Sequence, residues 1–135
     1  MERPTPLAVP PVSESRQLRA LRGATTASDN TVDAINEAVA ELVDALVERN
    51  ALSGPQLLSV TFSVTADLNA CFPAAIARRR PGWEQVALLD CQQMAVSGDL
   101  THCIRLLAHA WMDASRVPCH PYLRGAHQLR PDRAS

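Results

Sequence analysis

The sequence predicts an α+β domain in which a five-stranded β-sheet packs on one long α-helix. One segment, 31–50, repeats apolar residues at helical spacing, and five shorter segments are apolar or alternate in polarity as strands do. The 135 residues are enough for one domain with its own core. Because a single long helix covers only one face of such a sheet, the other face is expected to be uncovered.

The first two elements are a strand and the long helix. Residues 17–23 alternate, which places Leu18, Ala20 and Arg22 on one face of the first strand. Capping residues at 28–31 precede the helix. The apolar stripe of the helix, at spacings of three and four, consists of Val32, Ile35, Val39, Leu42 and Leu46.

The middle of the chain predicts a strand, a short helix and another strand. Residues 58–65 alternate, and one side of this strand carries Leu58, Val60, Phe62 and Val64. Pro73 opens a short helix at 73–79, because proline is well tolerated in the first helical turn. Residues 86–90 are nearly all apolar, which predicts a strand in the centre of the sheet.

Two more strands complete the predicted sheet, one at 103–111 and a short one within 122–129. The order is therefore strand, long helix, strand, short helix and three strands. Nothing in this order covers the second face of the sheet. We expect that face to pair with another subunit, so the protein should be an oligomer.

Composition excludes several classes of partner. The net charge of −1 disfavours nucleic acids and anionic membranes, which require a basic excess. No apolar run is long enough to span a membrane. Residues 1–16 are rich in proline and lack the apolar core of a signal peptide, so we expect a flexible leader before a domain at 17–135.

The cysteines and histidines do not predict a metal site. Cys71, Cys91, Cys103 and Cys119 form no CxxC pair, and their spacing is not that of a zinc site. Reduced thiols in the cytoplasm are the expected state. The four histidines are scattered over strand and loop, so we interpret them as solvated or hydrogen-bonded side chains.

Three arginines indicate the kind of ligand. Arg22 and Arg105 lie within apolar, strand-like stretches, and Arg130 lies in a short motif near the end of the chain. An arginine is costly to bury without an anionic partner, and its guanidinium matches a carboxylate in bidentate geometry. Arginines that converge from different strands therefore predict a site for a small polycarboxylate.

Short motifs are spread along most of the chain. In order they are Arg22-Gly23-Ala24-Thr25-Thr26, Ala66-Asp67-Leu68-Asn69-Ala70, Phe72-Pro73-Ala74, Gly82-Trp83, Gln92-Gln93-Met94, Gly98, Leu100, Cys103-Ile104-Arg105, Tyr122-Leu123 and Leu129-Arg130-Pro131-Asp132. Each is weak alone, but their order and spacing are specific. Together they resemble the AroH-class chorismate mutases, the monofunctional, Bacillus-type family.

This resemblance implies a fold, an assembly and a reaction. The family fold is a mixed five-stranded sheet on one long helix, assembled as a homotrimer with active sites between subunits. The implied reaction is the Claisen rearrangement of chorismate to prephenate, on the way to phenylalanine and tyrosine. The rearrangement needs no metal, cofactor or nucleophile, so catalysis has to come from holding a compact conformer and stabilising developing charge.

The resemblance also implies roles for individual residues. Arg105 would donate to the ether oxygen, where negative charge grows as the C–O bond breaks. Arg22 and Tyr122 would hold the enolpyruvyl carboxylate of the substrate.

Four further positions match residues around the substrate ring. Phe72 of a neighbouring subunit would form an apolar wall, and Leu129 an apolar contact. Arg78 and Arg130 would lie near the ring carboxylate. Core packing remains an alternative for Phe72, and a solvated helix end remains one for Arg78.

The sequence departs from the family at two positions that would meet the substrate hydroxyl. Family members have a cysteine at the position of Asp90 and a glutamate at that of Gln93, so here the carboxylate lies three positions earlier. We expect Asp90 to supply the missing carboxylate and Gln93 to complete the network. In the alternative interpretation, Asp90 only caps the following loop through backbone amides.

Two other functions remain open from the sequence. The departure at Asp90 and Gln93 allows a non-catalytic trimeric protein that binds small carboxylates in the same cleft. An enamine/imine deaminase, from a family of related trimeric architecture, is the second alternative. The combination of Arg105 with Arg22 and Tyr122 argues against the deaminase.

Overall fold

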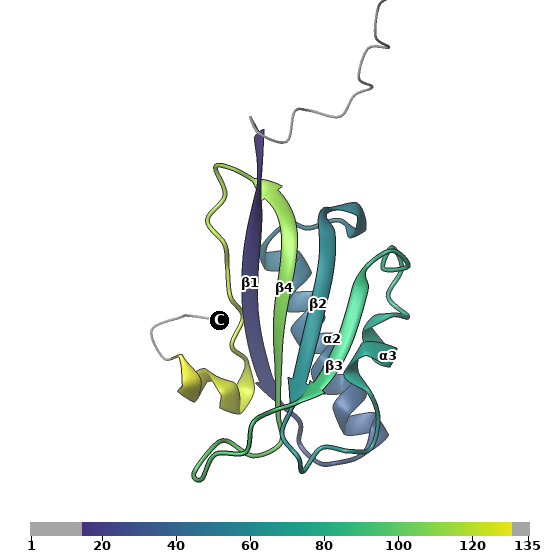
Figure 1. Ribbon diagram of the computed structural model, residues 1–135, viewed down its shortest axis with the longest axis vertical. Coiled ribbons are helices and arrows are strands. Elements are labelled where there is room, and N and C mark those ends of the chain that lie inside the picture. The colour runs from purple at the N-terminus through teal and green to yellow at the C-terminus, as the bar shows by residue number, and fades with distance from the viewer. Residues whose placement is uncertain (1–14, 131–135) are drawn as a thin grey trace, which may run out of the picture.

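The computed structural model describes residues 15–130, and the predicted leader lies almost entirely outside them. Its elements are β1 (Arg16–Thr26), α2 (Val32–Arg49), the 3-10 helix η1 (Gly54–Gln56), β2 (Leu57–Val64), α3 (Pro73–Ala77), β3 (Ala87–Gln92), β4 (Cys103–Asp113) and the 3-10 helix η2 (Arg124–Leu129). Figure 1 shows one sheet with α2 lying across its back. The expected α+β class and the single long helix are confirmed.

The sheet is mixed, as expected, but within residues 15–130 it has four strands and not five. Their order is β1-β4-β2-β3, with β4 antiparallel to both neighbours and β2 parallel to β3. The prediction that 86–90 is a central strand is also wrong, because β3 forms an edge. Leu88 of β3 packs against the core, while the adjacent Leu89 is 61% exposed on the other face. An apolar run alone does not distinguish a central strand from an edge strand.

The predicted last strand within 122–129 is not formed. Tyr122 makes a single parallel bridge with Ala24, and the chain then turns into η2. Pro121 has no N–H to extend the pairing backwards. Arg124 has a φ of 51°, a left-handed conformation that strands do not use.

Helix α2 forms where its apolar period predicted it. Thr31 caps the helix by accepting a hydrogen bond from the Ala34 N–H at 3.1 Å. The buried face of the helix consists of Ile35, Ala38, Val39, Leu42, Val43, Ala45 and Leu46. Val32, expected in this stripe, is exposed at the first helical position. The buried face packs on Leu21, Phe62 and Ile104 of the sheet to form the main core.

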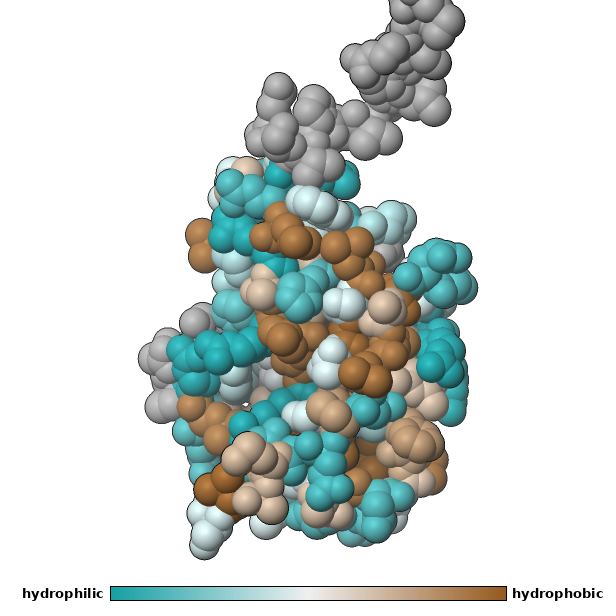
Figure 2. Space-filling view, viewed as in Figure 1, coloured by the Kyte–Doolittle hydropathy of each residue, from teal (hydrophilic) through white to brown (hydrophobic). Residues whose placement is uncertain are grey.

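The opposite face of the sheet has no covering layer among the described residues. Leu18, Ala20 and Arg22 lie on it together, as the alternation of β1 predicted, and all three are exposed. Leu107 in the central strand β4 is 42% exposed. Figure 2 looks onto this face and shows hydrophobic residues gathered over the middle of the sheet. None of the helices within residues 15–130 is long and apolar enough to cross a membrane.

Candidate active site

A row of side chains crosses the sheet at the end where β1 finishes and β4 begins. Arg105 on β4 lies opposite Ala24 on β1 and Ser63 on β2. Ala24 forms the bridge to Tyr122, and the Ser63 hydroxyl donates a hydrogen bond to Gln93 Oε1 at 3.0 Å. The fold therefore places Arg105 between Tyr122 on one side and Gln93 on the other.

Arg105 projects from the uncovered face of the sheet. Its neighbours Ile104 and Leu106 are buried in the core on the α2 side, and side chains alternate along a strand. A second, smaller apolar cluster contains Ala24, Tyr122 and Ala126, with Leu100 and Leu129 packed against it. This cluster fixes Tyr122 beside the row and places the predicted contact Leu129 next to it.

Arg22 joins the same group from β1. It lies two residues before Ala24, so its exposed side chain leaves the strand on the same face as Arg105. Its backbone N–H donates to Nδ1 of His120 at 2.9 Å, which ties β1 to the segment that carries Tyr122. Arg130 follows at the C-terminal end of η2 and is half-buried.

The guanidinium of Arg105 is held by an acid from the loop before β4. Its Nη2 donates to Asp99 Oδ1 at 3.1 Å, whereas its Nε is buried and has no hydrogen-bond partner in the described part of the chain. Burial raises the pKa of the neighbouring Cys103 thiol, although a hydrogen bond and positive charge from Arg105 oppose that rise. Cys103 is therefore a neutral, buried thiol beside the arginine.

Phe72, Arg78 and Asp90 form a separate group around α3. The Asp90 carboxylate accepts a hydrogen bond from the Ala74 N–H at 2.9 Å. Burial raises the pKa of Asp90, and the Ala74 N–H and the charge of Arg78 offset part of that rise. Phe72 is 70% exposed at the N-terminus of α3, and Arg78 is exposed at its C-terminus.

Asp90 and Arg105 leave the sheet on opposite faces. Asp90 is paired with Phe62, whose side chain is buried on the α2 side. A cavity of about 660 Å³ lies at this edge, lined by Phe72, Asp90, Cys91 and the loop that follows β2. Within one chain, Arg22, Arg105, Tyr122 and Gln93 are thus brought together, while Phe72, Arg78 and Asp90 lie elsewhere.

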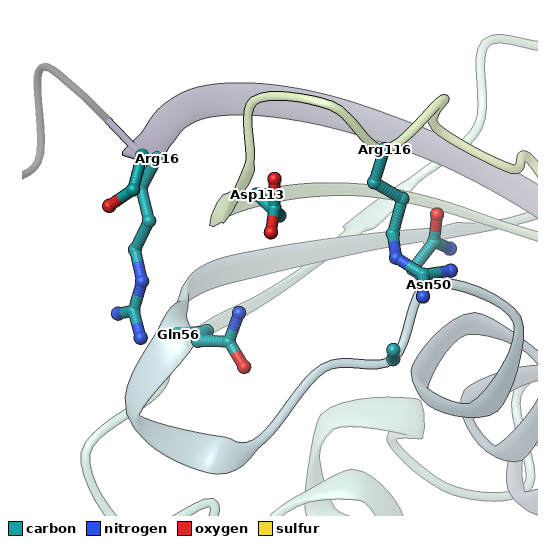
Figure 3. Close-up of a pocket in the computed structure, with 7 residues that line it drawn as sticks. Arg16, Asn50, Gln56, Asp113 and Arg116 are labelled. Carbon is teal, nitrogen blue, oxygen red and sulfur yellow. The ribbon is translucent and has the colours of Figure 1, made fainter.

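The opposite end of the sheet holds another cavity of about 400 Å³, shown in Figure 3. The two amide side chains in its wall make hydrogen bonds that hold the fold together. The Asn50 amide binds the backbone of Leu46 and Cys119, and the Gln56 amide donates to the Trp111 carbonyl oxygen at 3.0 Å. These hydrogen bonds tie the end of α2 and η1 to the sheet, so both labelled amides are already hydrogen-bonded within the chain.

Asp99 was not singled out by the sequence. It lies in an irregular loop six residues before Arg105, where no helical or strand period relates the two side chains. The available signal was Gly98, whose φ of 82° creates the turn that directs Asp99 back towards the strand. No group of three or more potential metal-ligating residues occurs within residues 15–130.

The fold and this site define an α+β protein in which two arginines, Arg22 and Arg105, leave a mixed sheet on the same face. Residues 18–133 match the family model for chorismate mutase type I. The chain is 41% identical to chorismate mutase AroH of Thermus thermophilus over 121 residues, covering 87% of this chain and 98% of that protein. It is 34% identical to chorismate mutase AroH of Bacillus subtilis strain 168 over 116 residues, covering 85% and 91%.

A solved chorismate mutase from Clostridium thermocellum has the same fold, with a TM-score of 0.75 and 39% identity over 82% of this chain and 99% of that one. The chain belongs to the chorismate mutase type I family and is therefore an isomerase of aromatic amino acid biosynthesis. Family membership thus favours the enzyme over the non-catalytic binder and the deaminase.

Proposed function

We propose that the protein rearranges chorismate to prephenate at a site built around Arg105. In this reaction the ether C–O bond breaks as a C–C bond forms within the same molecule, and no group is exchanged. The protein must hold the substrate in a compact conformer and stabilise negative charge on the ether oxygen.

Arg105 is the observation that carries this proposal. It combines a fixed guanidinium with a buried Nε that has no partner in the described part of its own chain. The Arg105 side chain as a whole is 32% exposed, so a ligand oxygen could reach its guanidinium. The guanidinium donors would stabilise the ether oxygen more strongly as its charge grows.

Arg22 and Tyr122 would hold the enolpyruvyl carboxylate beside Arg105. Both side chains are carried by backbone segments that pair with each other at one end of β1. Leu129 would supply an apolar contact from the end of η2, and Arg130 a positive charge near the ring carboxylate. Gln93, held by Ser63 on the other side of Arg105, would face the ring hydroxyl.

A neighbouring copy would complete the site with Phe72, Arg78 and Asp90. In one chain these residues lie at the β3 edge, separated from the face that carries Arg105. Contact between two different surfaces of identical chains is heterologous, and such contacts close into rings when the rotation permits. The exposed apolar residues Leu18 and Leu107 support a covering subunit on the open face. We infer a homotrimer with three shared sites.

The test is a chorismate-consumption assay with the purified full-length chain after treatment with a metal chelator. We expect loss of chorismate absorbance and stoichiometric appearance of prephenate without added cofactor. A folded, assembled sample that consumes chorismate no faster than buffer would overturn the proposed function.

A further inference from the structure

We propose that Asp99 is a positioning residue for Arg105, holding its guanidinium in the orientation that the substrate meets. Asp99 Oδ1 accepts from Arg105 Nη2 at 3.1 Å. Among the acids that the structure describes, Asp99 is the one that forms an ion pair with Arg105. The inference rests on the proposed function of Arg105, and it assigns a role to a residue outside the family motifs.

The loop that carries Asp99 fixes its carboxylate before any substrate binds. Gly98 makes the turn with a positive φ, and the Asp99 N–H donates to the Val96 carbonyl oxygen at 3.1 Å. The Leu100 N–H donates to Asp99 Oδ1 at 2.8 Å, so the oxygen that binds Arg105 is also held by the backbone. The Asp99 side chain is 20% exposed, which limits competition from water.

The loop is also anchored to the site itself. Leu100 packs against the small cluster that contains Ala24 and Tyr122. Asp99 is therefore fixed relative to both the strand that carries Arg105 and the segment that carries Tyr122. A displacement of this loop would move the guanidinium relative to the tyrosine.

Two of the donors on the Arg105 side chain differ in whether they have a partner. Nη2 is engaged by Asp99, while Nε remains buried without a partner in the described chain. An arginine side chain has many rotamers, and the ion pair removes most of them before the substrate arrives. Because misplacing a reacting or donating group by about 1 Å costs on the order of 10²-fold in rate, preorganisation of Arg105 should appear mainly in kcat.

The charge of Asp99 has a second consequence for the row. Arg105 lies directly opposite Ser63, and Ser63 holds the neutral amide of Gln93. Because Gln93 is neutral, the carboxylate that contacts Arg105 in this chain comes from Asp99. A carboxylate introduced at residue 93 would lie on the other side of Arg105 and could hold the same guanidinium from there.

The experiment compares Asp99→Ala and Asp99→Asn with a matched control, Asp29→Ala. Asp29 accepts its following backbone N–H at 2.8 Å, as Asp99 does, but within residues 15–130 it forms no ion pair with an arginine. We expect Asp99→Ala to lose roughly 10- to 100-fold in kcat with a smaller change in KM and an unchanged melting temperature. Asp99→Asn, which retains an acceptor oxygen, should lose less, and Asp29→Ala should match the wild type.

Rescue separates a positioning role from simple stabilisation of the loop. Gln93→Glu in the Asp99→Ala background should recover much of kcat, because it returns a carboxylate to Arg105. A kcat loss that accompanies a lower melting temperature, and that Gln93→Glu does not repair, would overturn the positioning role. Wild-type kcat and KM in Asp99→Ala would overturn it as well.

A readout that does not depend on turnover keeps this inference distinct from the proposed function. The ¹⁵N–¹H signal of Arg105 Nε, assigned by its loss in Arg105→Lys, should exchange slowly with solvent in the wild type and rapidly in Asp99→Ala. If the wild type does not turn over chorismate but this difference is present, the positioning stands and the proposed reaction fails. If the signal is identical in both proteins, the positioning fails.

Discussion

The Asp90 carboxylate accepts a hydrogen bond from the Ala74 N–H at 2.9 Å, which ties the edge strand β3 to the start of α3. This contact places Asp90 beside Phe72 in the wall of the cavity at the β3 edge. It also supports the interpretation in which Asp90 only caps a backbone amide, since the Ala74 N–H already binds the carboxylate. In the other interpretation the charge of Asp90 acts on the substrate hydroxyl.

Asp90→Asn tests that charge. If Asp90 meets the substrate hydroxyl, the variant should lose catalytic efficiency, whereas a carboxylate that only caps a backbone amide should tolerate the change. Gln93→Glu should be tolerated and should recover activity in an Asp90→Ala background. Full activity of Asp90→Ala together with an inactive Gln93→Ala would show that the carboxylate has not been relocated to residue 90.

The difference in melting temperature between the wild type and Asp90→Asn should depend on pH in a defined direction. Burial raises the pKa of Asp90 in the folded state, so the neutral acid is favoured by folding. The stabilisation that Asp90 contributes is present below its unfolded pKa and is lost as the pH rises through its raised folded-state pKa. Thermal unfolding at pH 7 should therefore find Asp90→Asn at least as stable as the wild type, with the advantage shrinking in acid.

Arg105→Ala should fold and assemble normally but lose most turnover. Removing one donor to developing charge typically raises the barrier by about 3–4 kcal/mol. Arg105→Lys should also be poor, because an ammonium does not reproduce the planar fork that Asp99 holds. Steady-state kinetics with circular dichroism measure both properties. Arg116→Ala, at the far end of the sheet, is the control and should keep full turnover.

Leu107→Glu should prevent assembly. Leu107 lies in the central strand between Arg22 and Thr61, on the face that has no covering layer among the described residues. An unpaired carboxylate buried there by a second subunit would cost several kcal/mol. Light scattering should give about three times 14.6 kDa for the wild type and a smaller mass for the variant. Val32→Glu, an exposed apolar position on α2, should remain assembled. An active wild-type monomer would contradict this prediction.

Asp67→Asn should weaken the fold at neutral pH. Burial alone would raise the pKa of Asp67, but hydrogen bonds from the Thr65 hydroxyl and the His102 N–H, with the charge of His102, hold that pKa below its usual value. The stabilisation that Asp67 contributes is therefore present above its unfolded pKa and is lost as the pH falls through its lowered folded-state pKa. The side chain is partly exposed, so we expect a loss of only about 1 kcal/mol. Denaturant titrations should show the difference at pH 7 and its progressive decline once the pH falls below about 4, the usual pKa of an aspartate, with Asp29→Asn unaffected.

Local patterns in the sequence were enough to predict most of the elements. The apolar period from Val32 to Leu46 identified α2, and alternation identified β1 and β2, because each pattern reflects burial on one side of one element. The motifs around Arg22, Arg105 and Tyr122 predicted residues that the fold does bring together. These signals are short-range, so they do not depend on which strands become neighbours.

Only the tertiary structure decided the position of β3 at the edge, the 3-10 helix after Tyr122 and the opposite faces of Asp90 and Arg105. Each follows from pairing between distant segments, and a one-residue difference in register reverses the face of a side chain. Tyr122 stops at a single bridge because Arg124 turns away to bind Glu37 and Glu41 on α2, contacts more than eighty residues apart in the chain. Asp99 reaches Arg105 through a loop turn without periodicity, so its contact is a property of the folded chain alone.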